Sequence, residues 1–195
     1  DVNAFYTLLD NAMVKRNDLF NEQDSIMYDG ELSQVQSIQN AAYAKVWGIQ
    51  ADFELMLTKQ LMLSSRFNYQ KGTEEIDNGT TSPLRHATPW FGVTKLTYTG
   101  TKLKMELFAH FSGEVSYSNL AEEERGKPYI YAIDSNGKPY SPSWYTLNFR
   151  SQYQINKTLA ISGDVENITN QRYRPYSSGI VAPGFNFIVA VRARF

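Results

Sequence analysis

The last eleven residues of the chain, 185–195, carry an apolar side chain at every odd position. These positions run from Phe185 to Phe195, whereas the even positions include Asn186, Arg192 and Arg194. Side chains of a β-strand point alternately to its two faces, so a period of two predicts a strand with one apolar and one polar face.

Seven further segments show the same period, at residues 2–14, 47–57, 61–69, 90–98, 103–111, 145–153 and 159–165. The first is less regular, and the other six carry no charge on their apolar face. Charged residues gather on the opposite face: Arg66, Lys95, Lys104, Glu106, Arg150, Asp164 and Arg192. The chain is therefore predicted to be all-β, with about eight antiparallel strands. A soluble β-sandwich alternates in the same way, so alternation alone leaves that class open.

Several apolar faces are aromatic at both ends and aliphatic or small between. This arrangement is typical of transmembrane β-barrels, whose aromatic girdles mark the two membrane interfaces. The predicted girdle comprises Trp47, Trp90, Tyr98, Tyr145, Tyr153, Phe185 and Phe195. Ten residue steps span roughly 33 Å, and a tilt of about 40° reduces this to roughly 25 Å, the height of an outer-membrane apolar band.

The connections between the predicted strands alternate in length. Short turns at 58–60, 99–102 and 154–157 alternate with long polar loops at 15–39, 70–87, 112–143 and 171–184. Outer-membrane barrels place short turns on the periplasmic rim and long loops outside the cell. Counting strands back from Phe195 puts Asp1 on the periplasmic rim too. Asp1 opens directly in strand-like sequence, so we expect the start to be a processing or cloning boundary.

Composition removes several other classes of protein. The net charge of -1 gives no global attraction for nucleic acid, and the absence of cysteine argues against a small disulfide-stapled domain. No run approaches the roughly 20 apolar residues of a spanning helix. The mean hydropathy of -0.43 is compatible with a barrel, because every second residue of a spanning strand faces water.

Few residues suggest catalysis or metal binding. A hydrolase-like set could be drawn from His110, Ser112, Asp164 and Glu166, but a polar lumen wall explains them without chemistry. His86 alone in a loop is a poor metal site. The charge run 122–125 could contact a ligand, although we favour a solvated loop. We predict no catalytic residue, metal or cofactor.

Five aromatic residues in the predicted loops are candidates for ligand capture, because exposed rings beside polar groups stack on sugars and other rings. They are Tyr117, Tyr129, Tyr131, Tyr140 and Trp144. The alternatives are that they belong to the extracellular girdle or pack within the loop.

Several short motifs resemble one family. Residues 165–173, Val-Glu-Asn-Ile-Thr-Asn-Gln-Arg-Tyr, resemble the V-x-N-[LI]-T-[ND]-x-x-Y segment near the end of TonB-dependent outer-membrane receptors. Ala-Pro-Gly at 182–184 and the terminal strand ending in Phe195 are similar to the closing elements of that family. Ala-Phe-Tyr-Thr at 4–7 and the strand after Gly48 resemble two further family strands.

The resemblance implies that residues 1–195 are the C-terminal part of a barrel of roughly 22 strands, closed by a plug, in the bacterial outer membrane. It implies active uptake of a scarce ligand such as a metal chelate, haem, vitamin or glycan. The implied partners are membrane lipid, the remaining strands and plug, and TonB through an N-terminal region absent here. The barrel-assembly machinery would read Phe195 as its signal.

Three rival interpretations stay open on the sequence alone. The chain could close on itself as a small eight-stranded barrel with a structural or adhesive role, although its charged inner face would then have to be satisfied inside a filled interior. It could be a soluble β-sandwich, in which case the aromatic-ended faces would pack against each other. An outer-membrane enzyme is the third possibility.

Overall fold

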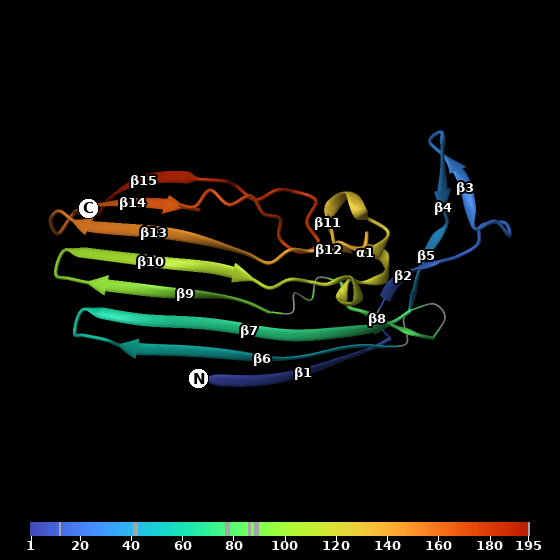
Figure 1. The fold of residues 1–195 in the computed structure, drawn as a ribbon, viewed down its shortest axis with the longest axis horizontal. Coiled ribbons are helices and arrows are strands. Elements are labelled where there is room, and N and C mark those ends of the chain that lie inside the picture. The colour runs from blue at the N-terminus through green and yellow to red at the C-terminus, as the bar shows by residue number, and fades with distance from the viewer. Residues whose placement is uncertain (12, 41–42, 77–78, 86, 88–89, 195) are drawn as a thin grey trace.

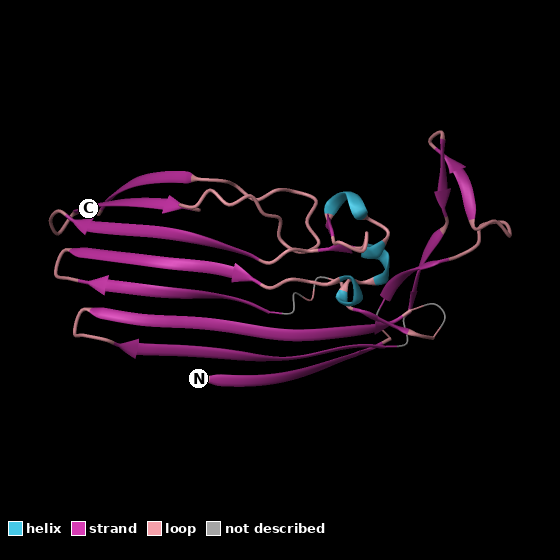
Figure 2. Ribbon diagram, in the orientation of Figure 1, coloured by secondary structure: helices cyan, strands magenta, loops and turns pink. Residues whose placement is uncertain are grey.

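One large antiparallel sheet dominates the computed structural model, which describes residues 1–11, 13–40, 43–76, 79–85, 87 and 90–194. Eight long strands follow one another in the order of the sequence, each paired with the next (Figures 1 and 2). They are β1 (Val2–Asp10), β6 (Tyr43–Met56), β7 (Leu61–Glu75), β9 (Trp90–Thr99), β10 (Leu103–Ser112), β13 (Trp144–Gln154), β14 (Leu159–Glu166) and β15 (Asn186–Ala193). The predicted all-β class and the eight strands are confirmed.

The strand register joins the apolar faces of neighbouring strands into one surface. Residues paired across an antiparallel sheet share a face, and a slip of one residue would exchange the faces. One row of paired apolar residues crosses from β6 to β15: Leu55, Leu63, Leu96, Leu107, Phe149, Val165 and Phe187. The neighbouring row on the other face is mostly polar and includes Thr97, Glu106, Arg150 and Asp164.

Aromatic side chains form a row near the long-loop ends of the strands. The rings of Trp47 and Tyr69 lie 5.5 Å apart, and those of Trp90 and Phe111 lie 6.0 Å apart. Tyr69 pairs with Trp90, which carries the row from one strand to the next. Tyr145, which pairs with Phe111, extends it further, while Tyr98 and Tyr153 pair with Leu61 and Leu103 beside the short turns.

The first charged residues beyond this row, on the same face, are Lys45 and Lys71. An uncharged band therefore separates two aromatic zones, and their position at the two membrane interfaces stays a prediction. Phe185 lies just before β15, and Phe195 lies outside the described residues.

The short turns are closed by local hydrogen bonds. Gly100 donates its N–H to the Leu103 carbonyl (2.8 Å), and Ile155 donates to the Leu159 carbonyl (2.9 Å). The Asn156 carboxamide oxygen accepts two further backbone N–H groups, from residues 158 and 159, both at 2.9 Å. This side-chain mimicry of a turn is why asparagine is favoured there.

All the long connections emerge at the opposite end of the sheet, and three of them, β1–β6, β7–β9 and β10–β13, contain short elements of their own. These are β2 (Met13–Asn17), β3 (Ser25–Tyr28), β4 (Glu31–Gln34), β5 (Gln36–Asn40), β8 (Thr81–Pro83), η1 (Tyr117–Asn119), α1 (Glu122–Arg125), η2 (Pro128–Ile130), β11 (Ala132–Ile133) and β12 (Pro139–Tyr140). In the described ranges, no helix is long and apolar enough to cross a membrane.

The expectation of a plain polar loop at 15–39 was wrong. The first strand ends at Asp10, and the segment after it forms two successive β-ribbons, β2 with β5 and β3 with β4. Short stretches such as Ser-Ile-Met-Tyr, interrupted by acidic turn residues, hid the strand signal.

The fully buried side chains lie among the long loops and not in the sheet: Val115, Leu120, Ala121 and Glu124 are at most 1% exposed. The apolar face of the sheet stays open, with Tyr145 and Phe187 each more than half exposed. A β-sandwich would cover that face, so the soluble-sandwich interpretation was wrong. The large sheet ends at β1 on one side and β15 on the other, which do not pair within the described residues.

The aromatic row depends on the absence of a side chain at Gly113, against which the ring of Trp90 lies. A Cβ atom built on Gly113 would lie 1.9 Å from Nε1 of Trp90, so Gly113→Ala must displace the indole ring from its place beside Phe111. We expect a loss of about 1–3 kcal/mol in the free energy of unfolding, measured by urea titration in detergent.

Gly163→Ala is the matched control, because this strand glycine on the apolar face has only Ser151 Oγ at 4.0 Å from an added Cβ. The control should change the free energy of unfolding by less than about 0.5 kcal/mol. Equal effects of the two substitutions would contradict the packing of Trp90 on Gly113.

Candidate functional site: a charged wall beneath a bonded loop layer

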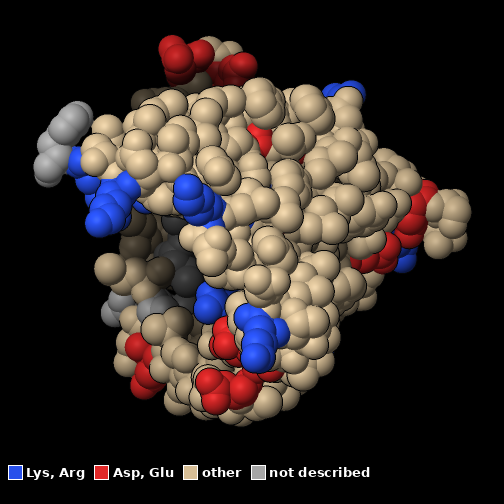
Figure 3. All heavy atoms as spheres, turned by 90° about the vertical axis from the view of Figure 1, so that its left-hand side faces the viewer, with Lys and Arg blue, Asp and Glu red and all other residues tan. Residues whose placement is uncertain are grey.

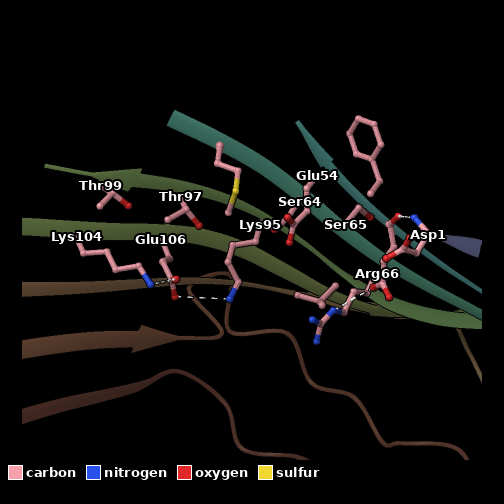
Figure 4. Close-up of a pocket in the computed structure, with 14 residues that line it drawn as sticks. Asp1, Glu54, Ser64, Ser65, Arg66, Lys95, Thr97, Thr99, Lys104 and Glu106 are labelled. Atoms are coloured by element: carbon pink, nitrogen blue, oxygen red, sulfur yellow. Dashed lines mark hydrogen bonds and ion pairs between the residues drawn. The ribbon is translucent and has the colours of Figure 1, made fainter. Parts of the chain in front are cut away.

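The polar face of the sheet lines a hollow of about 720 Å³ between β6 and β10 (Figure 4). Viewed from the short-turn end, acidic and basic side chains surround this hollow (Figure 3). Its lining includes Asp52, Glu54, Arg66, Lys95, Lys104 and Glu106. These residues occupy the face whose charges the alternating pattern predicted.

Charges on this wall are paired among the described residues, three times across neighbouring strands and once within β10. Arg66 Nε lies 3.1 Å from Asp52, and Arg150 Nε lies 2.9 Å from Asp164. The Glu106 carboxylate forms ion pairs with Lys104 Nζ at 2.9 Å and with Lys95 Nζ at 3.7 Å. Partly exposed pairs of this kind each contribute at most about 1 kcal/mol, so they do little for stability. The pairs leave a polar, partly exposed wall with no large excess of positive or negative charge.

Above the wall, three loops meet at one buried carboxylate. Glu124 of α1 has no exposed surface and binds Arg85 Nε at 2.6 Å and Lys127 Nζ at 3.2 Å. Its other oxygen accepts hydrogen bonds from the hydroxyls of Tyr131 and Ser177. Arg85 belongs to the β8–β9 connection and Ser177 to the β14–β15 connection, so one side chain joins three loops into a loop layer.

The pKa values of Glu124 and Tyr131 are shifted in the directions that keep Glu124 ionised and Tyr131 protonated. Burial raises the pKa of Glu124, but hydrogen bonds from Tyr131 and Lys127 and the charge of Arg85 outweigh burial and bring the pKa below its usual 4.5. Burial and the bond to Glu124 raise the pKa of the Tyr131 hydroxyl, which therefore stays a donor at neutral pH. The expectation that the run 122–125 is a solvated loop was wrong for Glu124.

A smaller pocket of about 320 Å³ lies on the wall below the loop layer. Trp144 stacks on Tyr173 at 4.2 Å between ring centroids, and Phe108, His110 and Glu166 complete much of the lining. Stacked rings beside a carboxylate and an imidazole form a surface that suits a planar or sugar-like group.

Hydrogen bonds made by the segment 167–170 hold the two ends of the last long loop together. Asn167 and Asn170 adopt positive φ values of 48° and 50°, which asparagine tolerates better than most residues. The Asn167 carboxamide donates to the carbonyls of Gln171 (2.9 Å) and Pro183 (3.2 Å). Asn170 Oδ1 accepts the N–H of Phe185, which positions the start of β15.

This geometry agrees with the comparisons with known proteins. Residues 1–168 match the family described as TonB dependent receptor-like, beta-barrel. The chain belongs to this family. Members are outer-membrane receptors and not enzymes, and the family places this chain in the Gram-negative outer membrane.

Solved structures of receptors in this family share the fold. The chain is similar to a copper transporter, OprC, with a TM-score of 0.71, 12% identity, and coverage of 100% of this chain and 28% of that one. It is also similar to the Pseudomonas aeruginosa ferric enterobactin receptor PfeA, crystallised with enterobactin as a Q482A mutant (TM-score 0.69, 14% identity, coverage 98% and 28%).

A third similar structure is the siderophore receptor PirA of Pseudomonas aeruginosa, with a TM-score of 0.62, 14% identity, and coverage of 98% and 26%. The chain thus spans little more than a quarter of these receptors. No curated protein matches it.

The five aromatic residues predicted for ligand capture have different surroundings. Tyr117 lies under the cations Arg125 and Lys138, both 5.1 Å from the ring centroid, and Tyr131 is bound to Glu124, so both pack within the loop layer. Tyr140 is half-buried in β12, whereas Tyr129 is 76% exposed. Trp144 faces the wall pocket.

The structure does not assemble the hydrolase-like set. His110 and Glu166 line the Trp144 pocket, but Asp164 is paired with Arg150 and Ser112 is not among the lining residues. His86 lies outside the described residues. In the part of the chain that the structure describes, no group of three or more His, Asp or Glu side chains is placed to hold a metal ion.

Sequence reasoning missed the burial of Glu124 and the role of Tyr173. One signal was available for Glu124: three consecutive glutamates between Ala121 and Arg125 permit one helical turn with one residue facing inward. Nothing in the sequence indicated that Arg85 and Ser177, 39 and 53 residues away, would supply its partners.

The loop layer yields a prediction for Glu124→Gln. The substitution removes the charge that compensates Arg85 and Lys127, so amide hydrogens of residues 113–143 and 171–184 should exchange about 10–100-fold faster, corresponding to about 1–3 kcal/mol. Glu123→Gln is the control, because that side chain is 57% exposed and pairs with Arg85 only at the surface.

The pH dependence has a defined sign. Because the Glu124 pKa is lowered in the folded state, its contribution is complete above about pH 4.5 and is lost as the pH falls through the lowered pKa. Hydrogen exchange of the loops should therefore be protected equally at pH 7 and pH 5 and lose protection at lower pH. Protection that already declines between pH 7 and pH 5 would contradict this account.

Proposed function

We propose that the protein containing this chain takes up a scarce ligand across the outer membrane by TonB-dependent transport. One observation supports this best: a single sheet of this receptor family has an outer face with an uncharged band between two aromatic zones, a charged inner wall and a bonded loop layer at one end. Lipid would cover the outer face, and the lumen and plug would adjoin the inner wall. The ligand would meet the loop layer.

The partners follow from this division of the surface. The uncharged face and its aromatic zones would contact outer-membrane lipid. The free edges of β1 and β15 would pair with the remaining barrel strands, and the paired charges of the wall would face a plug. TonB would act through the plug, and the barrel-assembly machinery would recognise the terminal strand ending in Phe195.

The ligand class is inferred from the aromatic residues of the loop layer and wall. Tyr129 is free to meet solutes, and Trp144 with Tyr173 offers a stacked aromatic surface beside Glu166. Such groups suit a ligand with planar or sugar rings, within the range of metal chelates, haem, vitamins and glycans. The similar structures include receptors for copper and for ferric enterobactin, which are examples of such cargo.

A self-contained small barrel with a structural or adhesive role is not favoured. The similar solved structures are receptor chains of which this chain covers only 26–28%. The charged wall residues also need water or a polar plug beside them, which the filled interior of an eight-stranded barrel would not provide.

Uptake by whole cells tests this proposal. Cells that produce the full receptor would be offered a panel of ferric chelates, haem, cobalamin and oligosaccharides, and depletion from the medium would be measured. We expect one class to be depleted, and depletion to stop when TonB is deleted or a protonophore is added. Depletion that persists without TonB would overturn the proposal.

In that assay, Trp144→Ala should raise the ligand concentration that gives half-maximal uptake by roughly tenfold, because the stacking surface of the pocket is lost. Tyr145→Ala is a matched control, since this adjacent aromatic residue points to the outer face. Equal effects of the two substitutions would remove the Trp144 pocket from the ligand path.

A further inference from the structure

The first long connection forms an arm, residues 13–40, that is separate from the large sheet. It consists of the β2–β5 ribbon followed by the β3–β4 ribbon, and it stands away from the other loops (Figure 1). Because it leaves the sheet between β1 and β6 at the long-loop end, the arm lies on the extracellular side.

Large apolar side chains of the arm are covered by no other described part of residues 1–195. Leu19, Met27 and Leu32 are 62%, 68% and 72% exposed, and Phe20, Tyr28 and Ile38 are similarly open. No arm residue whose exposure is described is buried. The neighbouring loop layer, in contrast, buries Val115, Leu120 and Ala121.

Leu19, Met27 and Leu32 converge on one concave surface of about 670 Å³, together with Glu22 and Asp24. Met27 and Leu32 are cross-strand partners, so they share one face of the β3–β4 ribbon. A two-stranded ribbon is marginally stable alone, and an apolar face of this kind is typical of a surface that a partner covers.

The charge of the arm tip defines that partner. Between Asn17 and Gln34 there are five acidic residues, Asp18, Glu22, Asp24, Asp29 and Glu31, and no Lys, Arg or His. Five negative charges within residues 18–31 repel a second copy of the same tip. They also oppose insertion among anionic lipid headgroups, which attract basic and not acidic segments.

We propose that the arm is a docking site for an extracellular protein whose contact surface places basic residues around an apolar protrusion. The protrusion fills the concave surface formed by Leu19, Met27 and Leu32, and the basic residues meet Glu22 and Asp24, which line that surface, and the other acidic residues of the arm tip. Such charge complementarity accelerates encounter and makes the association sensitive to salt.

Photocrosslinking on intact cells tests the docking site. The full receptor would carry the photoreactive residue p-benzoylphenylalanine in place of Leu32, and adducts would be identified by mass spectrometry. We expect an adduct with one other protein, at a peptide rich in Lys and Arg. Its yield should fall roughly tenfold when Glu22→Gln, Asp24→Asn and Glu31→Gln are combined, and also when salt is raised.

Two controls isolate the arm. The same photoreactive residue at Tyr129, exposed in another loop, should not capture this partner, and Glu114→Gln, an exposed acid outside the arm, should leave the yield unchanged. An adduct within the same receptor, with a second copy or with lipid, or no adduct at all, would overturn the docking site. Uptake measured in the same strains reports on the transport proposal separately.

Discussion

The pairing register of the eight long strands is the constraint on which the other features depend. In a hydrocarbon layer every backbone N–H and C=O must be satisfied within the protein, and a curved antiparallel sheet does this between strands. The same register gathers an uninterrupted apolar row on one face, in which Leu107 lies between Leu96 and Phe149. A slip of one residue would turn Glu106 and Arg150 toward lipid.

In the proposed receptor one face of the sheet meets lipid and the other meets the lumen, so the sheet has no interior in which to bury a core. Close packing therefore occurs where the loops meet, around Leu120, Ala121 and Glu124. A carboxylate can be buried there because Arg85, Lys127, Tyr131 and Ser177 satisfy it together. The loss of either cation would leave charge less compensated, and the loss of either hydroxyl would leave a buried oxygen short of a hydrogen bond.

The sequence was sufficient for the sheet because its signal is local and repeated. A period of two, read in segments such as 103–111, specifies which side chains share a face, and short turns such as that at Asn156 specify the order of pairing. The loop layer could not be predicted in this way, because its contacts join residues 39 and 53 positions apart without any periodic pattern. The arm was missed for a related reason, since strands of four residues carry too few alternations to be recognised.

The central claim is that alternate residues of each long strand face lipid and lumen, and cysteine scanning of β10 tests it most directly. Residues 1–195 contain no cysteine, so a single one placed in turn from position 103 to 112 would report alone in a full receptor whose cysteines elsewhere, where present, are replaced by serine. The account predicts that a water-soluble maleimide reacts at even positions such as 104, 106 and 110 and not at odd positions such as 105, 107 and 109. Reactivity that shows no period of two, or the opposite phase, would contradict it.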